Sequence, residues 1–324
     1  MKPPVFIVGC PRSGTSFLYH LLLSAGGFAE FHTQMNAYDV LEPIYGPLTS
    51  PKNRARMMRD WLQSKAFEVS GLDAPQIEAE VVDQCRSIGD FMATVMNEVA
   101  ARQGVERWVD STPTNVPHML HIAADFPDAQ FLHIIRDPRD VALSLEKRQW
   151  ARPLPWHKDR AVLAAGLYWE WIVRKGKEYG RRLSSRYMEV RYEELVQKPE
   201  TALARIGGFL QCDLDYARIQ RAGVGSVKTP LTSFSEDLKR GEFSPVGRWK
   251  DKFPPGQLRD FEDLVGGYMA ELGYPRSTEP GRHRLFVTRN RFLYGCFYPF
   301  KQWAKVNTPL SRMMVNYSEI LFDK

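Results

Sequence analysis

The stretch "VGCPRSGTSFLYHLL", Val8 to Leu22, sets the order of the first elements of the chain. The β-branched apolar run that leads into it, Val5 to Val8, predicts a short strand buried on both faces. Gly9 and Gly14 then enclose four residues, and a segment of helical character follows. A strand, a glycine-bounded loop and a helix together aim backbone N–H groups and a helix N-terminus at an anion. The stretch therefore predicts an α/β fold with a phosphate-binding loop.

This loop lacks the lysine that reaches the β- and γ-phosphates in nucleoside triphosphatases and kinases. Thr15 stands at that position, Ser16 follows it, and Arg12 is the only cation of the loop. A guanidinium group presents a planar fork of donors to an oxyanion. We therefore expect an anionic ligand that does not require magnesium.

A second segment, "AQFLHIIRDPRDVALSL", predicts a buried strand from Phe131 to Ile135, a proline-containing turn and a helix. Arg136 follows the strand, at the place where open α/β sheets bind their ligands. Ser144 comes eight residues later and could hold the same phosphate group as Arg136. The alternative is that Arg136 pairs with Asp137 or Asp140 and has a structural role.

Together the two segments resemble the sulfotransferase family that uses 3′-phosphoadenosine 5′-phosphosulfate (PAPS), in its bacterial type. "PRSGTS" (Pro11 to Ser16) resembles the 5′-phosphosulfate loop, and "RDPRDVALS" (Arg136 to Ser144) resembles the 3′-phosphate motif. The weaker matches are "STPTN", "VRYEELVQKPETALARIGGFL" and "VGRWKDKFPPGQLRDFEDLVGGYMAELGY". The resemblance covers residues 1 to about 275.

The resemblance implies a P-loop-like three-layer α/β fold, with a central parallel sheet flanked by helices. It also implies PAPS as the sulfuryl donor, 3′-phosphoadenosine 5′-phosphate (PAP) as the product of PAPS, and no metal. The cofactor contacts carried over by the motifs are Pro11, Arg12, Ser13, Gly14, Thr15, Ser16, Arg136, Ser144, Tyr192 and Arg248. Arg12 is expected to stabilise both the leaving phosphate and the transferring sulfonate. The acceptor would be a hydroxyl or amine of a glycan, a lipid or a small molecule.

The general base stays open at this stage. Relatives often carry a glutamate shortly after the first helix, but Gln34 stands near that position, and Ser111 replaces a lysine that relatives carry. Three nearby side chains can accept a proton: Glu30, His32 and Asp110. Histidine titrates closest to neutral pH without help, which favours His32 as the base.

Helical periodicity organises the rest of the chain. Residues 36–106 predict a helical insert that shapes the acceptor site, with helices at Asn53 to Phe67 and at Ile88 to Gly104. Residues 157–183 predict a further amphipathic helix. We expect a domain over residues 1–275 and an extension over residues 276–324.

Composition places the protein among ordinary soluble proteins, with 324 residues, 44% hydrophobic and 25% charged. Four scattered cysteines fit a reducing compartment, and the seven histidines show no metal-binding spacing. The first predicted strand begins close to Met1, so we expect no signal peptide and no N-terminal membrane anchor, unlike the Golgi members of the family. A cytoplasmic location is expected.

The extension differs from the domain in charge. Residues 276–324 hold nine Lys/Arg and three Asp/Glu, so they carry the whole formal charge of +6. Basic residues alternate there with Phe, Tyr and Trp, a pattern typical of helices that lie on an anionic membrane surface. The alternatives are packing onto the domain and a contact in a homodimer. Charge alone would allow nucleic-acid binding, but no recognition motif supports it.

Two other functions compete with sulfuryl transfer. The first is a non-catalytic PAP(S)-binding protein that acts at a membrane or partner surface, suggested by the missing glutamate and lysine. The second is a phosphate-loop kinase, which the absent loop lysine argues against.

Overall fold

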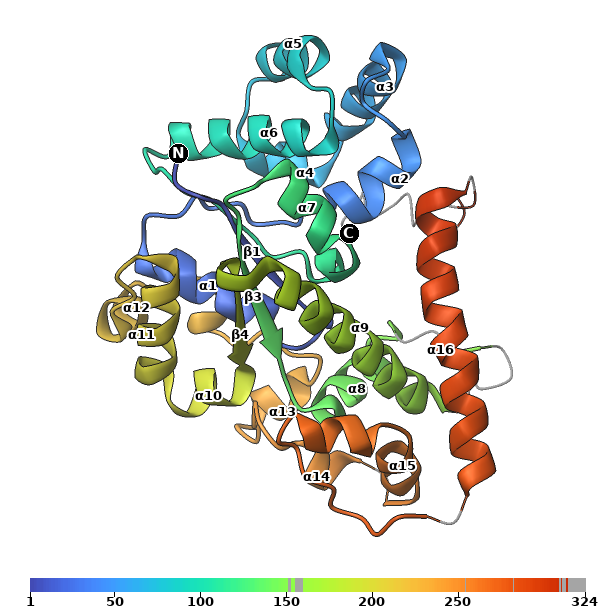
Figure 1. Cartoon of the computed structure of the whole chain (residues 1–324). Coiled ribbons are helices and arrows are strands. Elements are labelled where there is room, and N and C mark those ends of the chain that lie inside the picture. The colour runs from blue at the N-terminus through green and yellow to red at the C-terminus, as the bar shows by residue number, and fades with distance from the viewer. Residues whose placement is uncertain are drawn as a thin grey trace.

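The computed structural model describes residues 1–150, 153–154, 160–253, 255–281, 283–308, 310 and 313. These residues form a three-layer α/β structure, in which helices cover both faces of a four-stranded parallel sheet (Figure 1). The predicted fold class is therefore confirmed.

The sheet places the first strand of the chain in its interior. The strands are β1 (Val5–Gly9), β2 (Val109–Asp110), β3 (Gln130–Ile135) and β4 (Tyr187–Arg191). Their order is β2-β1-β3-β4, and every neighbouring pair is parallel. Each of the two predicted strands is confirmed with one residue more than expected.

Alternate residues of β1 enter different halves of the core. Val5 and Ile7 pack with the apolar side chains of α1 (Thr15–Ala25), α11 (Pro199–Leu210) and α12 (Tyr216–Ala222). Phe6 and Val8 pack instead with those of α6 (Ile88–Arg102), α9 (Ala161–Leu183) and the insert. All four side chains are fully buried. A parallel sheet covered on both faces requires such a continuous apolar run.

The bounds of the remaining helices follow the chain order. The α-helices are α2 (Glu42–Tyr45), α3 (Pro51–Trp61), α4 (Lys65–Ser70), α5 (Ala74–Gln84), α6 (Ile88–Arg102), α7 (Met119–Asp125), α8 (Pro138–Lys147), α9 (Ala161–Leu183), α10 (Tyr192–Gln197), α11 (Pro199–Leu210), α12 (Tyr216–Ala222), α13 (Ser235–Lys239), α14 (Trp249–Lys252), α15 (Pro255–Glu271) and α16 (Arg284–Asn307). The π-helix is η1 (Ala37–Leu41), and the 3₁₀ turns are η2 (Pro113–His118), η4 (Ser184–Arg186) and η5 (Gly225–Val227).

Local capping explains where the insert departs from the prediction. The single helix expected from Asn53 to Phe67 is two helices, α3 and α4, because Ser64 stops the first and accepts a hydrogen bond from the Phe67 N–H as the N-cap of the second. The second predicted helix is confirmed as α6, which begins at a capping box made by Ser87 and Asp90. The helix expected over residues 157–183 is α9, and residues 157–159 lie outside the described residues.

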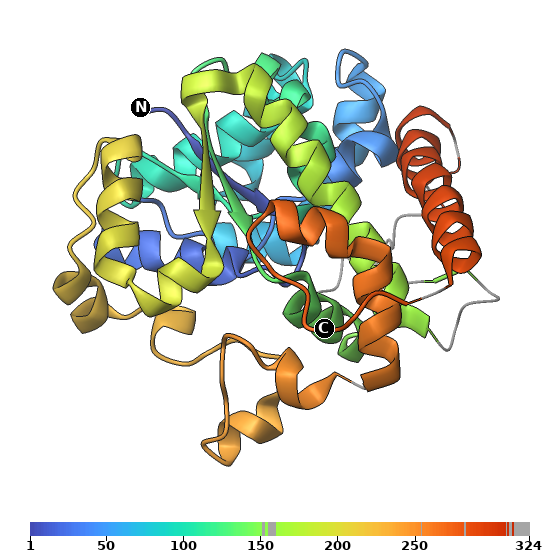
Figure 2. The same cartoon turned by 60° about the horizontal axis from the view of Figure 1, so that its bottom comes forward.

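The insert and the last helix occupy different parts of the surface. Helices α5 and α6 lie toward the end of the sheet where the strands begin, opposite the arrowheads (Figure 1). Helix α16 stands at the edge of the molecule in both views, beside α9 (Figure 2). No helix among the described ranges is long and apolar enough to cross a membrane.

Candidate functional site

The carboxyl ends of the four strands deliver most of the predicted site residues to one edge of the sheet. The loop of residues 11–16 follows β1, and Asp110 is the last residue of β2. Arg136 directly follows β3, and Tyr192 directly follows β4. Ligands of open parallel sheets bind at this edge. The chain topology thus brings together motifs that are more than a hundred residues apart.

The loop after β1 is held in a strained backbone conformation. Arg12 has φ 73° and Gly14 has φ 103°, both in the left-handed region, which costs a residue with a side chain about 1–2 kcal/mol. Gly14 is also required for space, because a Cβ there would lie 2.3 Å from the ring of Tyr192. Gly14 is the N-cap of α1 and no side chain caps that helix. The first N–H groups of α1 therefore face the loop.

Arg12 reaches from this loop to two other parts of the chain. Its Nε donates to Ser144 Oγ at 3.0 Å, and its Nη2 donates to Ser233 Oγ at 3.2 Å. The two serine hydroxyls lie 2.8 Å apart. The guanidinium group also lies 5.5 Å from the ring centre of Trp150. The structure therefore joins Arg12 and Ser144, which the two sequence motifs had supplied separately.

Arg136 completes the meeting of the two motifs. Its guanidinium group donates to the Arg12 carbonyl at 3.1 Å and to the Pro245 carbonyl at 2.7 Å, and stacks 4.4 Å from the ring centre of Tyr192. It also forms an ion pair with Asp140 at 3.7 Å, so the pairing named in the structural alternative is present for Asp140. Its Nε is buried and has no hydrogen-bond partner within the described part of the chain.

The segment that contains Arg248 is held over this site by a single carboxylate. Asp140 accepts hydrogen bonds from the Gly247 N–H and the Trp249 N–H, each at 2.9 Å. Between these two anchors, Arg248 is buried, stacks over Phe234 at 4.1 Å and donates to a backbone carbonyl. Asp140 therefore connects the "RDPRD" motif to the "GRWK" motif.

Arg12 and Arg248 both lie close enough to Arg136 for the three positive charges to affect one another. Burial, with help from Arg148 and Arg136, lowers the pKa of Arg12 to about 10. Burial and Arg136 also lower the pKa of Arg248. Arginines that repel one another in a partly buried site favour an anion between them. Ser13 adds a fully buried hydroxyl with no partner among the described residues.

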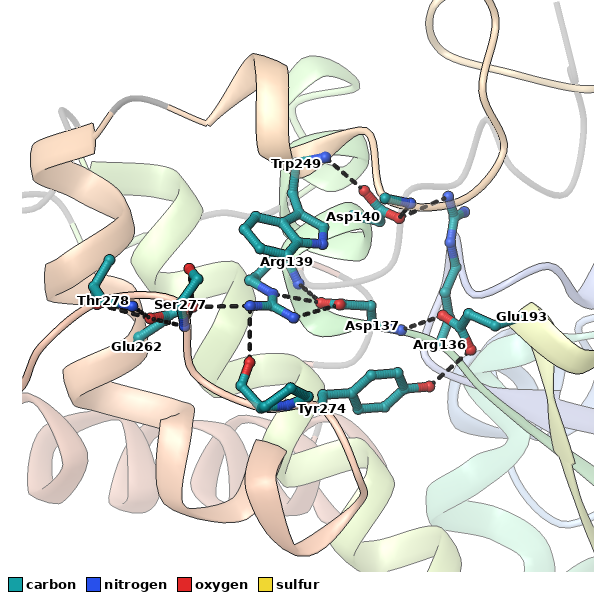
Figure 3. Close-up of polar contacts among 12 residues, drawn as sticks. Arg136, Asp137, Arg139, Asp140, Glu193, Trp249, Glu262, Tyr274, Ser277 and Thr278 are labelled. Atoms are coloured by element: carbon teal, nitrogen blue, oxygen red, sulfur yellow. Dashed lines mark hydrogen bonds and ion pairs between the residues drawn. The ribbon is translucent and has the colours of Figure 1, made fainter.

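A buried ionic cluster fixes the second arginine of the same motif and anchors the site (Figure 3). Arg139 donates to both oxygens of Asp137, donates to Glu262 at 2.9 Å, and lies 3.6 Å from the ring centre of Trp249. Glu262 in turn accepts hydrogen bonds from the backbone and hydroxyl groups of Ser277 and Thr278. Arg139 thus ties the start of α8 to α15 and to the chain beyond it.

The three candidate bases do not gather around Arg12. His32 and Glu30 form an ion pair at 3.3 Å, with about half of each side chain exposed, on the segment that packs against Tyr19 in the middle of α1. Asp110 is buried, and burial raises its pKa to about 6 against the effect of three hydrogen bonds from Thr112 and Asn115. Among the described residues, no hydrogen bond or ion pair joins any of the three to Arg12.

Other chemistry finds little support at this edge. Cys10 is fully buried in the loop, and burial raises the pKa of its thiol, which disfavours the reactive thiolate. The part of the chain that the structure describes holds no group of three His, Cys, Asp or Glu side chains placed for a metal. A cavity of about 360 Å³ lies at α11 and α12, and none of the candidate residues lines it.

Sequence reasoning missed two residues of the site. Ser233 contacts both Arg12 and Ser144, and the sequence indicates Asp140 only as a partner of Arg136. Ser233 stands in the irregular segment "PLTSF", which carries no periodicity that could have marked it. Asp140 belongs to a quoted motif, but its backbone partners lie 107 and 109 positions away.

Comparisons with known proteins point to one family. The profile of the Sulfotransferase family matches residues 3–216. A Caenorhabditis briggsae chain that carries the name protein-tyrosine sulfotransferase is 24% identical over 307 residues, covering 91% of this chain and 97% of that one. The omega-hydroxy-beta-dihydromenaquinone-9 sulfotransferase Stf3 of Mycobacterium bovis is 26% identical over 249 residues, covering 63% of this chain and 61% of that one. The solved sulfotransferase domain from the curacin biosynthetic pathway aligns with a TM-score of 0.57 at 16% identity, covering 87% of this chain and 99% of that one.

Proposed function

The chain belongs to the sulfotransferase family, and we propose that it transfers a sulfuryl group from PAPS to a hydroxyl or amine of its acceptor. One observation supports this choice of donor: Arg12 contacts both Ser144 and Arg136 at the carboxyl edge of the sheet. PAPS carries a phosphosulfate at one end of its ribose and a phosphate at the other. Two anion-binding motifs in contact suit such a ligand better than a nucleotide with a single phosphate chain.

The residues present fit this ligand. The loop offers the N–H groups at the start of α1, the buried hydroxyl of Ser13 and the side chains of Thr15 and Ser16, which we assign to the 5′-phosphosulfate. Arg136, with a buried Nε that has no partner among the described residues, and Ser144 are assigned to the 3′-phosphate. Tyr192 holds Arg136 in place by stacking, and Arg248 adds a further charge nearby.

In the reaction, the bond between sulfur and the bridging oxygen of PAPS breaks while a bond from sulfur to the acceptor oxygen or nitrogen forms. Arg12 stabilises the negative charge that develops on the leaving phosphate, since its guanidinium group is the cation of the loop. The backbone N–H groups of α1 share this role. No metal is required by this arrangement.

The proton of the acceptor must pass to a base. We assign it to His32, with Glu30 as its ion-pair partner, because this pair is accessible to solvent and an imidazole nitrogen can accept a proton. Asp110 is less suited, since its two oxygens already accept three hydrogen bonds inside the protein. Replacing His32 by Gln should then lower turnover, whereas Asp110→Asn should act mainly on stability.

The acceptor is a glycan, a lipid or a small molecule in this proposal. The relatives' names span a protein tyrosine and a menaquinone derivative, so the family does not narrow the choice. The non-catalytic alternative is not favoured, because these relatives are named as sulfotransferases. The kinase alternative would also need the loop lysine that Thr15 replaces.

Thermal unfolding with two nucleotides tests the donor assignment. PAP should raise the midpoint far more than adenosine 5′-phosphate, since only PAP engages Arg136 and Ser144. At a hundredfold excess over its Kd, a ligand contributes about 2.7 kcal/mol of stability. Ser144→Ala and Arg136→Ala should remove the preference, and Arg181→Ala, an exposed change at the end of α9, should keep it. Equal shifts with both nucleotides would contradict the assignment.

The transfer step needs a separate assay. Radiolabelled PAPS is incubated with the protein and a panel of glycan, phenol, amine and lipid alcohol acceptors, and label in the acceptor is counted. Sulfated product with any acceptor supports catalysis. Tight PAP binding without transfer to any acceptor class would favour the non-catalytic alternative instead.

A further inference from the structure

Helix α16 shows two different faces along its length. One face is buried against the rest of the protein through Asn290, Tyr294, Tyr298 and Ala304. The other face exposes large apolar side chains, with Leu285 89%, Phe292 70%, Phe300 62% and Trp303 54% exposed. We call the set Leu285, Phe292, Cys296, Phe300, Trp303 and Val306 the outer stripe; all six side chains are exposed.

The spacing of the outer stripe follows the helix. Its members are separated by seven, four, four, three and three positions, so they project from one side of an α-helix. A helix of 24 residues is about 36 Å long at 1.5 Å per residue. An apolar side of this length is uncommon on a monomeric protein and marks an interaction surface.

The packed face holds α16 firmly, so the outer stripe cannot turn inward. The Tyr298 hydroxyl donates to the Ala164 carbonyl at 2.7 Å, and Arg291 forms an ion pair with Glu170 at 2.8 Å. Lys305 reaches Asp39 in the π-helix η1 at 2.7 Å. Burial acts to raise the pKa of Asp39, but His118 and Lys305 outweigh it and lower that pKa. These contacts present the outer stripe to solvent as a fixed surface.

Charge decides between the occupants of this surface. The sequence contains no Asp or Glu between Glu279 and Glu319, and the exposed residues Arg284 and Arg289 lie on or beside the outer stripe. A second copy of this chain would bring two such positive segments together. An anionic lipid surface would instead attract the basic residues while the aromatic rings settle at the headgroup level.

We propose that α16 lies in the plane of an anionic membrane surface, with the outer stripe buried among the lipid headgroups. The helix is amphipathic and rich in aromatic and basic residues, as interfacial helices are. Within the described ranges no helix could span the membrane, so the contact is peripheral. The Leu154 N–H donates to the Tyr294 hydroxyl, so Leu154 lies beside the docked helix.

Vesicle co-sedimentation of the full chain tests the proposal. Wild-type protein should bind vesicles of phosphatidylcholine that contain about 30–40% of the anionic lipid phosphatidylglycerol. Binding should be stronger at low salt than at high salt. Arg284→Gln with Arg289→Gln should weaken partitioning by about five-fold per residue. Phe292→Gln with Trp303→Gln should abolish binding at either salt. Arg181→Gln with Arg182→Gln, also two exposed arginines, is the matched control and should bind as wild type does.

The readouts separate this proposal from its competitors. All changed side chains are exposed, so the melting temperature of each variant should stay near that of the wild type, and a large drop would call for milder Phe292→Ser and Trp303→Ser changes. No binding by the wild type, or equal binding by the Phe292/Trp303 variant, would overturn the proposal. If the wild type elutes as a dimer in gel filtration and the Phe292/Trp303 variant elutes as a monomer, the outer stripe would instead be the contact with a second copy. Transfer activity on a water-soluble acceptor should not change in any variant.

Discussion

At the scale of single residues, Arg12 is the side chain on which loop geometry and charge meet. Its backbone is left-handed, its guanidinium group is partly buried, and it contacts both Ser144 and Ser233. A strained backbone is kept where the surrounding structure and the function require it. The strain at Arg12 therefore supports its assignment to the reaction.

We predict that Arg12→Ala lowers turnover by roughly 10², the loss typical for one charge-stabilising donor. Arg12→Gly should lose as much turnover but be more stable than Arg12→Ala, because glycine adopts φ 73° without the cost of about 1 kcal/mol that alanine incurs. Steady-state kinetics and thermal unfolding of the two variants check this. Near-normal turnover in either would remove Arg12 from the mechanism.

A second residue-scale prediction concerns pH and stability. Burial raises the pKa of Asp110 from 3.8 to about 6, so its contribution to stability is present at low pH and is lost as the pH rises from about 4 to 6. Burial lowers the pKa of His133 from 6.5 to about 4, so its contribution is present above about 6.5 and is lost as the pH falls to 4. Each amounts to about 3 kcal/mol at 1.36 kcal/mol per pKa unit.

The two groups thus oppose each other in the same pH range. Asp110→Asn should leave the His133 effect unopposed, so stability should rise by about 3 kcal/mol more than in the wild type between pH 4 and 6.5. His133→Gln should change the slope in the opposite direction. Urea denaturation at a series of pH values measures both. Parallel curves for the wild type and Asp110→Asn would contradict the assignment of Asp110 as a buried carboxyl of raised pKa.

Individual site residues could be predicted where a continuous motif carries them. Arg12, Arg136 and Ser144 were named from two short stretches, and the structure brings them together. Ser233 could not be named, because its contact with Ser144 spans 89 positions of sequence and its own segment has no pattern. The assignment of Arg12, Arg136 and Ser144 to PAPS stays a prediction. The assignment of His32 and Glu30 to proton transfer also stays a prediction.

At the scale of elements, the site depends on how α8 holds the segment that carries Arg248. Asp140 lies in the first turn of α8 and fixes the N–H groups of Gly247 and Trp249. Burial raises the pKa of Asp140 and Arg136 acts to lower it, so the carboxylate and the arginine depend on each other. The phosphate-binding arginine and the covering segment are therefore positioned together.

We predict that Asp140→Asn weakens PAP binding by about tenfold or more, the range seen when a supporting contact of a binding group is removed. Asparagine keeps the shape but can accept only one of the two backbone hydrogen bonds with its oxygen, and it loses the charge opposite Arg136. Isothermal titration with PAP measures the effect. Glu178→Gln, which removes an exposed carboxylate on α9, is the control, and equal affinities in both variants would argue against the positioning role.

Elements were predicted best where periodicity was long. The strands around the two motifs and helix α6 agree with the structure to within one or two residues at each end. The division of the expected helix into α3 and α4 was missed, because Ser64 ends one helix and caps the next without a proline or glycine to mark the break. The π-helix η1 was also missed, since its extra residue per turn leaves no mark in the apolar pattern.

At the scale of the whole molecule, the boundary expected after residue 275 is crossed by strong contacts. Ser277 and Thr278 satisfy the fully buried Glu262, and α16 packs on α9 and α2. The division into a domain and an extension stays a proposal. Of the extension itself, residues 282, 309, 311–312 and 314–324 lie outside the described residues.

We predict that two shortened chains differ sharply in stability. A chain ending at Gly281 keeps Ser277 and Thr278 and should fold, although it loses α16. Among the described residues, a chain ending at Tyr274 leaves the Glu262 carboxylate with Arg139 as its one partner. Breaking such a buried arrangement costs about 3–5 kcal/mol. It should melt several degrees lower or fail to fold. Similar melting temperatures for the two chains would show that these hydrogen bonds contribute little.

The central place of β1 in the sheet has a consequence for how the protein is made. Phe6 in β1 lies opposite Phe131 in β3, 125 positions further along the chain, and the sheet is complete only with β4 at residue 191. At about 5–20 residues per second, a ribosome needs roughly ten to forty seconds to synthesise this length. For much of that interval, until β2 at residues 109–110 and β3 at residues 130–135 have been made, the apolar first strand lacks a partner on at least one side. The yield of folded protein should therefore depend on chaperones that shield the amino-terminal segment until its neighbours emerge.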